Sequence, residues 1–129
     1  MQIALIASDS KKELMTQFCI AYQGVLSRHS LCSTAITGKY ITEATGLEIE
    51  KLLSGKQGGN EQIALRIAYD EIDVLLYFRD TNQPFSESDL NILGLCDAYN
   101  VPVATNLGTA EAIIHSLDRG DLDWRELLK

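Results

Sequence analysis

Five short apolar segments alternate with segments of helical periodicity, and this alternation limits the possible folds more than any other feature of the chain. The apolar segments are residues 3–7, 31–35, 47–53, 73–78 and 101–106. The runs at 3–7 and 73–78 are almost continuously apolar, which is typical of strands covered on both faces. Strands that alternate with helices form an open, mainly parallel sheet. The sequence therefore predicts an α/β fold with five strands.

Composition limits the class of protein. At 129 residues and 46% hydrophobic, the chain can form one domain, residues 1–129, with a sizeable core. A net charge of −7 disfavours nucleic acid as a partner. The apolar run at 3–7 is too short for a signal peptide or a membrane span, so we expect a cytoplasmic protein without a membrane partner. The spacing of Cys19, Cys32 and Cys96 fits neither a disulfide framework nor a zinc site, and predicts core thiols in a reducing compartment.

Helix signals follow each apolar segment. Ser10 with Glu13 three residues later is a capping-box pattern that predicts the start of the first helix. A loop leading into a short helix is expected after the second strand. A further helix is expected from about residue 60 to 71, where Ile63 and Ile67 share one face. The segment around Trp124 is expected to dock on the body of the domain or on a neighbouring subunit.

Polar residues follow every predicted strand. In a parallel sheet the carboxyl ends of the strands meet at one edge, which is where such folds bind ligands. We therefore expect one cleft that gathers the polar segments at residues 8–10, 34–38, 54–60, 79–80 and 105–106.

Two of these segments, residues 34–39 ("TAITGK") and 54–60 ("SGKQGGN"), combine hydroxyl groups, small residues and helix starts. Unpaired N–H groups and the helix dipole at such places favour a phosphate dianion. For either segment alone, a plain capping turn is the alternative. Neither is a Walker A loop, because Gly55-Lys56 is not followed by Ser or Thr. Lys12 could supply a cation to the same site, and its alternative is a solvated surface lysine.

Two carboxylates, Asp9 and Asp80, stand just beyond predicted strand ends. Carboxylates facing one cleft can share acid–base work on a substrate. The alternative is that each caps the helix that follows it. His29 and His115 lie at a helix end and within an apolar helix, where a structural role is the stronger expectation.

The chain resembles the methylglyoxal synthase family over almost its whole length. The resemblance rests on "IALIASD", "TAITG", "EATGL", "LLSGKQGGNEQI", "IDVLLYFRD" and "NVPVATNLGTAEAII", in that order. It implies a single three-layer Rossmann-like domain. It also implies the cofactor-free and metal-free conversion of dihydroxyacetone phosphate into methylglyoxal and inorganic phosphate, and assembly as a homohexamer. The same fold serves as a regulatory module in carbamoyl phosphate synthetase.

The resemblance also implies which residues bind the phosphate group. The family's lysine, threonines and Ser-Gly pair fall on Lys12, Thr34, Thr37, Ser54 and Gly55. The same two loops add three glycines to the predicted binding residues: Gly38, Gly58 and Gly59. The two aspartates that the family places after the first and central strands are matched by Asp9 and Asp80.

The catalytic positions depart from the family. Its Gly-Gly-Asp supplies the base that removes the carbon-bound proton, and this chain has Asn60 in place of that aspartate. The family's His-Asp pair after a proline falls on Phe85 and Ser88, and its histidine beside the first-strand aspartate is Ser8. A neutral amide cannot act as a general base. Glu61, one residue on, points about 100° away around a helix.

Three hypotheses follow from these matches and departures. The first is a family member that binds a small phosphorylated metabolite or inorganic phosphate, with synthase activity weak or lost. The second is an active methylglyoxal synthase in which Asp9, Asp80 or Glu61 replaces the base. The third is a regulatory module that senses a phosphorylated ligand.

Overall fold

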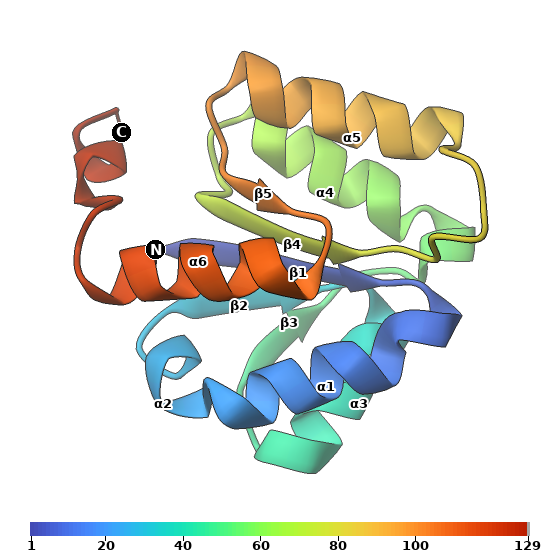
Figure 1. The fold of residues 1–129 in the computed structure, drawn as a ribbon. Helices are drawn as coiled ribbons and strands as arrows, with labels where there is room; N and C mark the ends of the chain where they lie inside the picture. Colours follow the sequence, from blue (N-terminus) through green and yellow to red (C-terminus); the bar gives the residue numbers. More distant parts are fainter. Residues whose placement is uncertain (129) are drawn as a thin grey trace.

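The computed structural model describes residues 1–128 and contains one five-stranded sheet in the order β3-β2-β1-β4-β5 (Figure 1). All four strand pairings are parallel, so the predicted α/β fold is confirmed. Ile3 pairs with Leu31 on one side and with Val74 on the other, which makes β1 the centre of the sheet. The strands are β1 (Gln2–Ala7), β2 (Ser30–Ser33), β3 (Ile49–Lys51), β4 (Val74–Phe78) and β5 (Val103–Ala104).

Helices cover both faces of the sheet and give three layers (Figure 1). Side chains of β1 alternate between the two cores, so Ile3 and Leu5 pack with α1, α3 and α6, whereas Ala4 and Ile6 pack with α4 and α5. The α-helices are α1 (Lys12–Ala21), α2 (Gln23–Leu26), α3 (Ala35–Thr45), α4 (Gly59–Ala68), α5 (Glu87–Ala98) and α6 (Leu107–Asp118). Short 3₁₀ helices are η1 (Asp9–Lys11), η2 (Gly55–Gln57) and η3 (Asp123–Leu128).

The three cysteines are buried and unpaired, as predicted for core thiols. Burial disfavours the thiolate and raises the pKa of Cys19 to about 12 and that of Cys32 to about 11. These thiols therefore act as small apolar groups within the two cores.

Two sequence predictions about helix starts are wrong. Ser10 lies inside η1, and α1 begins at Lys12 without a side-chain cap, so Ser10 and Glu13 form no capping box. The chain first makes a tight 3₁₀ turn in which the Lys11 N–H donates to the Ser8 carbonyl at 2.9 Å. In addition, α3 begins directly after β2 and not after a loop.

The C-terminal segment η3 packs against the body of the domain, at the amino end of β4. Its anchor is Arg125, only 2% exposed, whose Nε lies 3.3 Å from the Asp73 carboxylate. The same guanidinium donates to the backbone carbonyls of Ile72 and Asn100. Trp124, on which the sequence prediction was based, is 45% exposed. The segment therefore docks on the domain as predicted, through a buried ion pair.

Candidate functional site

A cavity of about 280 Å³ lies at the carboxyl ends of β1 and β4, beside the starts of α3 and α4. Six of the predicted site residues line it: Asp9, Lys12, Thr34, Ser54, Gly55 and Asn60. Ser8, Lys56 and Tyr77 line it as well. The parallel sheet thus brings together residues that are far apart in the sequence, as the sequence analysis predicted.

Lys12 is held at this cavity by two contacts. Its ammonium group donates to the Ala7 carbonyl at 2.7 Å and lies 3.1 Å from the Asp9 carboxylate. Its side chain is 12% exposed, so the alternative of a freely solvated lysine is wrong. The hydrogen bond and charge of Lys12 lower the pKa of Asp9, which favours an ionised carboxylate at this position.

The Thr34–Gly38 segment forms the start of α3. Thr34 is the N-cap residue, but its hydroxyl contacts the Thr37 hydroxyl at 3.3 Å and makes no side-chain cap with the helix. The Ala35 N–H donates to the Leu53 carbonyl at 3.3 Å, whereas the next amide groups of the first turn are left without that cap, beside the cavity. Thr37 is 1% exposed and does not line the cavity. Gly38 packs against β2, since a Cβ there would lie 2.3 Å from Ser33 Oγ.

The glycine loop has a backbone that requires its glycines. Gly58 has a φ of 106°, which side chains strongly disfavour. A Cβ on Gly59 would lie 2.0 Å from the Leu53 carbonyl oxygen, so only glycine fits this close approach. Both glycines therefore shape the loop without lining the cavity. The loop delivers Asn60 to the first turn of α4, while Glu61 beside it is exposed and does not line the cavity.

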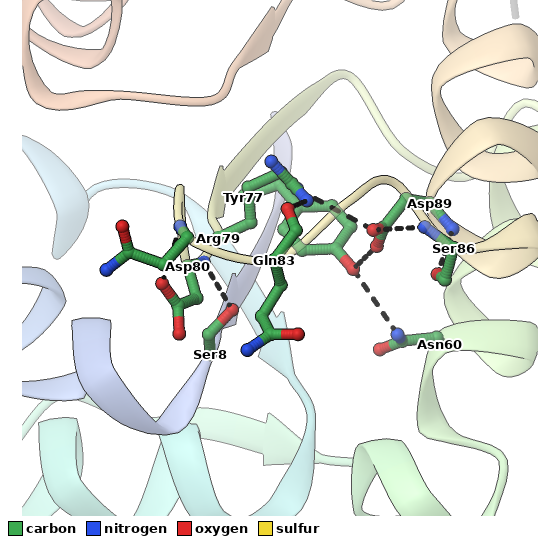
Figure 2. Close-up of polar contacts among 9 residues, drawn as sticks. Ser8, Asn60, Tyr77, Arg79, Asp80, Gln83, Ser86 and Asp89 are labelled. Atoms are coloured by element: carbon green, nitrogen blue, oxygen red, sulfur yellow. Dashed lines mark hydrogen bonds and ion pairs between the residues drawn. The ribbon is translucent and has the colours of Figure 1, made fainter.

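Asn60 belongs to a buried chain of polar contacts (Figure 2). Its amide nitrogen lies 3.5 Å from the Tyr77 hydroxyl, a long contact. The Tyr77 hydroxyl in turn donates to the Asp89 carboxylate. Asp89 also accepts the Ser86 N–H at 2.9 Å, and the Ser86 hydroxyl accepts the Asp89 N–H at 3.0 Å, which is a capping box at the start of α5.

The protonation states in this chain are set by its contacts. Burial of Tyr77 and its bond to Asp89 raise the pKa of the phenol well above its usual value. Burial alone would raise the pKa of Asp89, but the hydrogen bonds from Tyr77 and Ser86 and the charge of Arg79 outweigh it and lower that pKa. Tyr77 is therefore a neutral donor and Asp89 an ionised acceptor at neutral pH.

A second cavity, of about 520 Å³, adjoins the first and shares Ser8 and Asp9 with it. Arg79, Asp80, Phe85 and Asp89 line this second cavity. The Arg79 guanidinium lies 4.0 Å from the centre of the Phe85 ring and donates to the Gln83 carbonyl at 2.6 Å. Arg79 Nε also lies 3.6 Å from the Asp89 carboxylate, so this part of the site holds an ion pair beside an aromatic ring.

Asp80 caps a turn and not the following helix, which Ser86 caps, so the alternative given for Asp80 is wrong. Its carboxylate accepts the Asn82 N–H at 2.9 Å, and its own N–H donates to Ser8 Oγ at 2.9 Å. It therefore caps a turn at the rim of the second cavity and does not line the first.

Two predicted positions lie away from the cavities. Asn106 accepts the Thr109 N–H at 3.0 Å and caps α6, so the segment at 105–106 does not line either of the two cavities. Ser88 does not line them, and the carboxylate at this place comes from Asp89, one residue later.

Two residues of the site, Asp89 and Tyr77, were not predicted from the sequence. The Ser-x-x-Asp pattern at residues 86–89 was a signal for Asp89, whereas nothing in an apolar strand pattern marks Tyr77.

Residues 1–128 contain neither a candidate metal cluster nor a membrane-spanning helix. No group of three or more His, Cys, Asp or Glu side chains there is placed to hold a metal ion. No helix in this part of the chain is long and apolar enough to cross a membrane.

Comparison with known proteins gives consistent matches. Residues 15–105 match the model of the MGS-like domain family. The chain is 55% identical to a methylglyoxal synthase of Caldicellulosiruptor saccharolyticus, over 99% of this chain and 92% of that protein. It is 49% identical to a methylglyoxal synthase of Oceanobacillus iheyensis, over 100% and 94% respectively. The crystal structure of methylglyoxal synthase from Elizabethkingia anophelis NUHP1 superimposes with a TM-score of 0.82 at 35% identity, covering 88% of this chain and 76% of that one.

Proposed function

Since the chain belongs to the MGS-like domain family, we propose that it binds dihydroxyacetone phosphate or a similar small phosphorylated ligand, and that phosphate elimination from this ligand is weak or lost. The observation that carries the proposal is the contrast within one cavity: a cation and hydroxyl groups suited to a phosphate lie beside an amide at residue 60. The names of the relatives support the ligand class, and Asn60 argues against full activity.

The phosphate group would lie between Lys12 and the start of α3. Lys12 supplies a positive charge that is held in place, and the first turn of α3 presents amide groups that Thr34 does not cap. Ser54 adds a hydroxyl to the lining of the cavity, and this hydroxyl would have to turn from Gln57 Oε1, to which it donates at 3.1 Å, in order to bind the phosphate. A dianion can accept hydrogen bonds from all three sources, and charge-assisted bonds of this kind are the strong ones.

Elimination would need a base near the carbon atom that loses its proton. Asn60 cannot supply one, and the loss of a positioned base typically removes about 10²–10⁴ of the rate. Of the substitutes considered, Glu61 is exposed outside the cavity, Asp80 caps a turn, and Asp9 is paired with Lys12. Their present contacts favour the reading of weak or lost activity.

An active enzyme remains the second candidate because Asp9 lines the cavity as a carboxylate with a lowered pKa. A lowered pKa keeps Asp9 ionised but also makes it a weaker base. The third candidate, a regulatory module that senses the ligand, needs the same phosphate site but no catalysis.

We further propose that the protein is a cytoplasmic homohexamer. It needs no cofactor or metal and binds neither nucleic acid nor membranes.

The experiment measures binding and turnover on the same sample. Inorganic phosphate and dihydroxyacetone phosphate should raise the melting temperature, because a ligand of the folded state stabilises it. The shift should disappear in Lys12→Ala and persist in Lys39→Ala, which removes the same charge from an exposed position that lines neither cavity. The absence of any shift at millimolar phosphate would refute the binding proposal. Methylglyoxal release well above background would favour the active enzyme, and assays of Asp9→Asn, Asp80→Asn and Glu61→Gln would identify the base.

The proposed homohexamer is tested separately. Several large apolar side chains are exposed on the single chain, among them Leu65 at 60%, Tyr69 at 74% and Leu90 at 59%. Association of subunits is one way to cover such side chains. Light scattering at micromolar concentration should give a mass well above the 14.3 kDa of one chain, and a monomeric mass would refute the proposal.

A further inference from the structure

Two buried side-chain atoms within residues 1–128 have no hydrogen-bond partner, Asn60 Oδ1 and Arg79 Nε. Arg79 Nε lies 3.6 Å from the Asp89 carboxylate, so its charge is compensated. Asn60 Oδ1 is a neutral acceptor for which no donor is present. A buried polar atom without a hydrogen-bond partner costs stability, and such atoms are few in native proteins, so each one calls for a specific explanation.

The contacts of Tyr77 determine which way the Asn60 amide points. Asp89 is ionised and can only accept, so the Tyr77 proton must be directed at it. The Tyr77 oxygen is then free only to accept, and Asn60 must present its NH₂ group to it. With the NH₂ group toward Tyr77, a contact that Figure 2 marks with a dashed line, Oδ1 is the amide atom left for another donor.

Asn60 Oδ1 points toward Gly55. A Cβ on Gly55 would lie 3.6 Å from this oxygen, an ordinary van der Waals distance, so the Gly55 backbone is the neighbour that the acceptor faces. Gly55, Asn60, Tyr77 and Lys12 line the same cavity. A ligand held by its phosphate near Lys12 can therefore bring a hydroxyl group to Oδ1, and that hydroxyl would supply the missing donor.

We propose that Tyr77 is a positioning residue that turns Asn60 Oδ1 toward the cavity, so that the site selects phosphate monoesters bearing a free hydroxyl over otherwise similar phosphates. The inference rests on the proposed phosphate binding and specifies the class of ligand. Residue 60 then acts as a hydrogen-bond acceptor for an intact ligand and not as a base.

Calorimetry with three ligands tests the proposal: sn-glycerol 3-phosphate, n-propyl phosphate and inorganic phosphate. Glycerol 3-phosphate has the hydroxyl groups, propyl phosphate has the same carbon chain without them, and neither has a carbonyl group that would allow elimination. Wild-type protein should bind glycerol 3-phosphate about tenfold more tightly than propyl phosphate, as one satisfied acceptor predicts.

Three variants connect this preference to the contacts. Tyr77→Phe frees the Asn60 amide to rotate, and Asn60→Ala removes the acceptor, so the preference should fall below about threefold in both. The affinity for inorganic phosphate, measured in each variant, separates a loss of this preference from a loss of the phosphate site. Tyr40→Phe, the same change at a tyrosine that is 52% exposed and lines neither cavity, should keep the full preference.

Each failure has a distinct meaning. If the wild-type protein binds none of the three ligands, the proposed function is wrong. If it binds phosphate but shows equal affinity for the two esters, or if a preference survives in Asn60→Ala, the inference about residue 60 is wrong. If Asn60→Ala removes the preference and a folded Tyr77→Phe keeps it, the positioning role of Tyr77 is wrong. If Tyr77→Phe does not fold, Asp89→Asn takes its place, because an amide at residue 89 can donate to Tyr77 and removes the same constraint.

Discussion

The two edges of the sheet both bury polar side chains, but they differ in how completely those side chains are hydrogen-bonded. At the amino edge, Arg125 is buried against Asp73 and also donates to two backbone carbonyls. At the carboxyl edge, Asn60, Tyr77 and Asp89 also form a largely buried polar chain, but Asn60 Oδ1 and Arg79 Nε have no hydrogen-bond partner. A network whose groups all have partners serves stability, whereas one with unused groups is available to a ligand. Mutations at the two edges should therefore have different effects.

The largest effect is expected at the amino edge. Arg125→Ala leaves the buried Asp73 carboxylate without its guanidinium, and breaking a buried pair from one side costs about 3–5 kcal/mol. Urea unfolding should show this loss, while inorganic phosphate should still stabilise the variant. Arg119→Ala is the matched control, because its pair with Asp121 is exposed and should contribute less than about 1 kcal/mol. Equal losses in the two variants would contradict the distinction between buried and exposed pairs.

The next effect is on binding at the carboxyl edge. Lys12→Ala should weaken phosphate binding by about 10- to 100-fold, since hydrogen bonds to charged groups contribute about 1.5–3 kcal/mol. The affinity is measured by calorimetry and the stability by urea unfolding. A variant that binds phosphate like wild type would place the anion elsewhere.

A smaller effect is expected on the reaction. Asn60→Asp should raise methylglyoxal formation by at least about tenfold, or 1.4 kcal/mol of barrier, because it returns a carboxylate to the glycine loop. The gain should be partial, since the Tyr77 hydroxyl already donates to Asp89 and cannot serve both carboxylates equally. The comparison requires that the variant is folded and binds phosphate as before. No gain in such a variant would show that the amide at residue 60 is not what limits the reaction.

The smallest effect concerns acid stability. The pKa of Asp89 is lowered in the folded protein, so its carboxylate stabilises the fold above the unfolded pKa of about 4, and this contribution is lost as the pH falls further. Asp89→Asn has no such contribution to lose. The difference in melting temperature between wild type and Asp89→Asn should therefore shrink between about pH 6 and about pH 3. A constant difference over this range would contradict the assigned charge.

The sequence predicted most of the fold because its strongest signals concern burial. The apolar runs in β1 and β4 could hardly be anything but central strands, and the strand-end rule then brought Asp9, Lys12, Thr34, Ser54 and Asn60 to one cavity. Helix starts were harder to predict. Ser10 and Glu13 have the residues of a capping box, but a 3₁₀ turn intervenes, and such local choices depend on tertiary contacts.

The sequence did not predict the rest of the site, and the reason is physical. Tyr77 lies in an apolar strand and looks like a core aromatic, and only the structure brings its hydroxyl between Asn60 and Asp89. The family's aspartate falls on Ser88, but the carboxylate that lines the second cavity belongs to Asp89, one residue later. Loop length determines which side chain reaches the cavity, and periodicity carries no information about loops.

We propose that this site binds the phosphate group of a ligand and lacks the base that its elimination requires. The most direct test mixes the protein with dihydroxyacetone phosphate and follows both the melting temperature and methylglyoxal release, with the Caldicellulosiruptor saccharolyticus relative assayed in parallel. The account predicts clear stabilisation by the ligand and methylglyoxal formation close to background. Turnover comparable with that of the relative would contradict it.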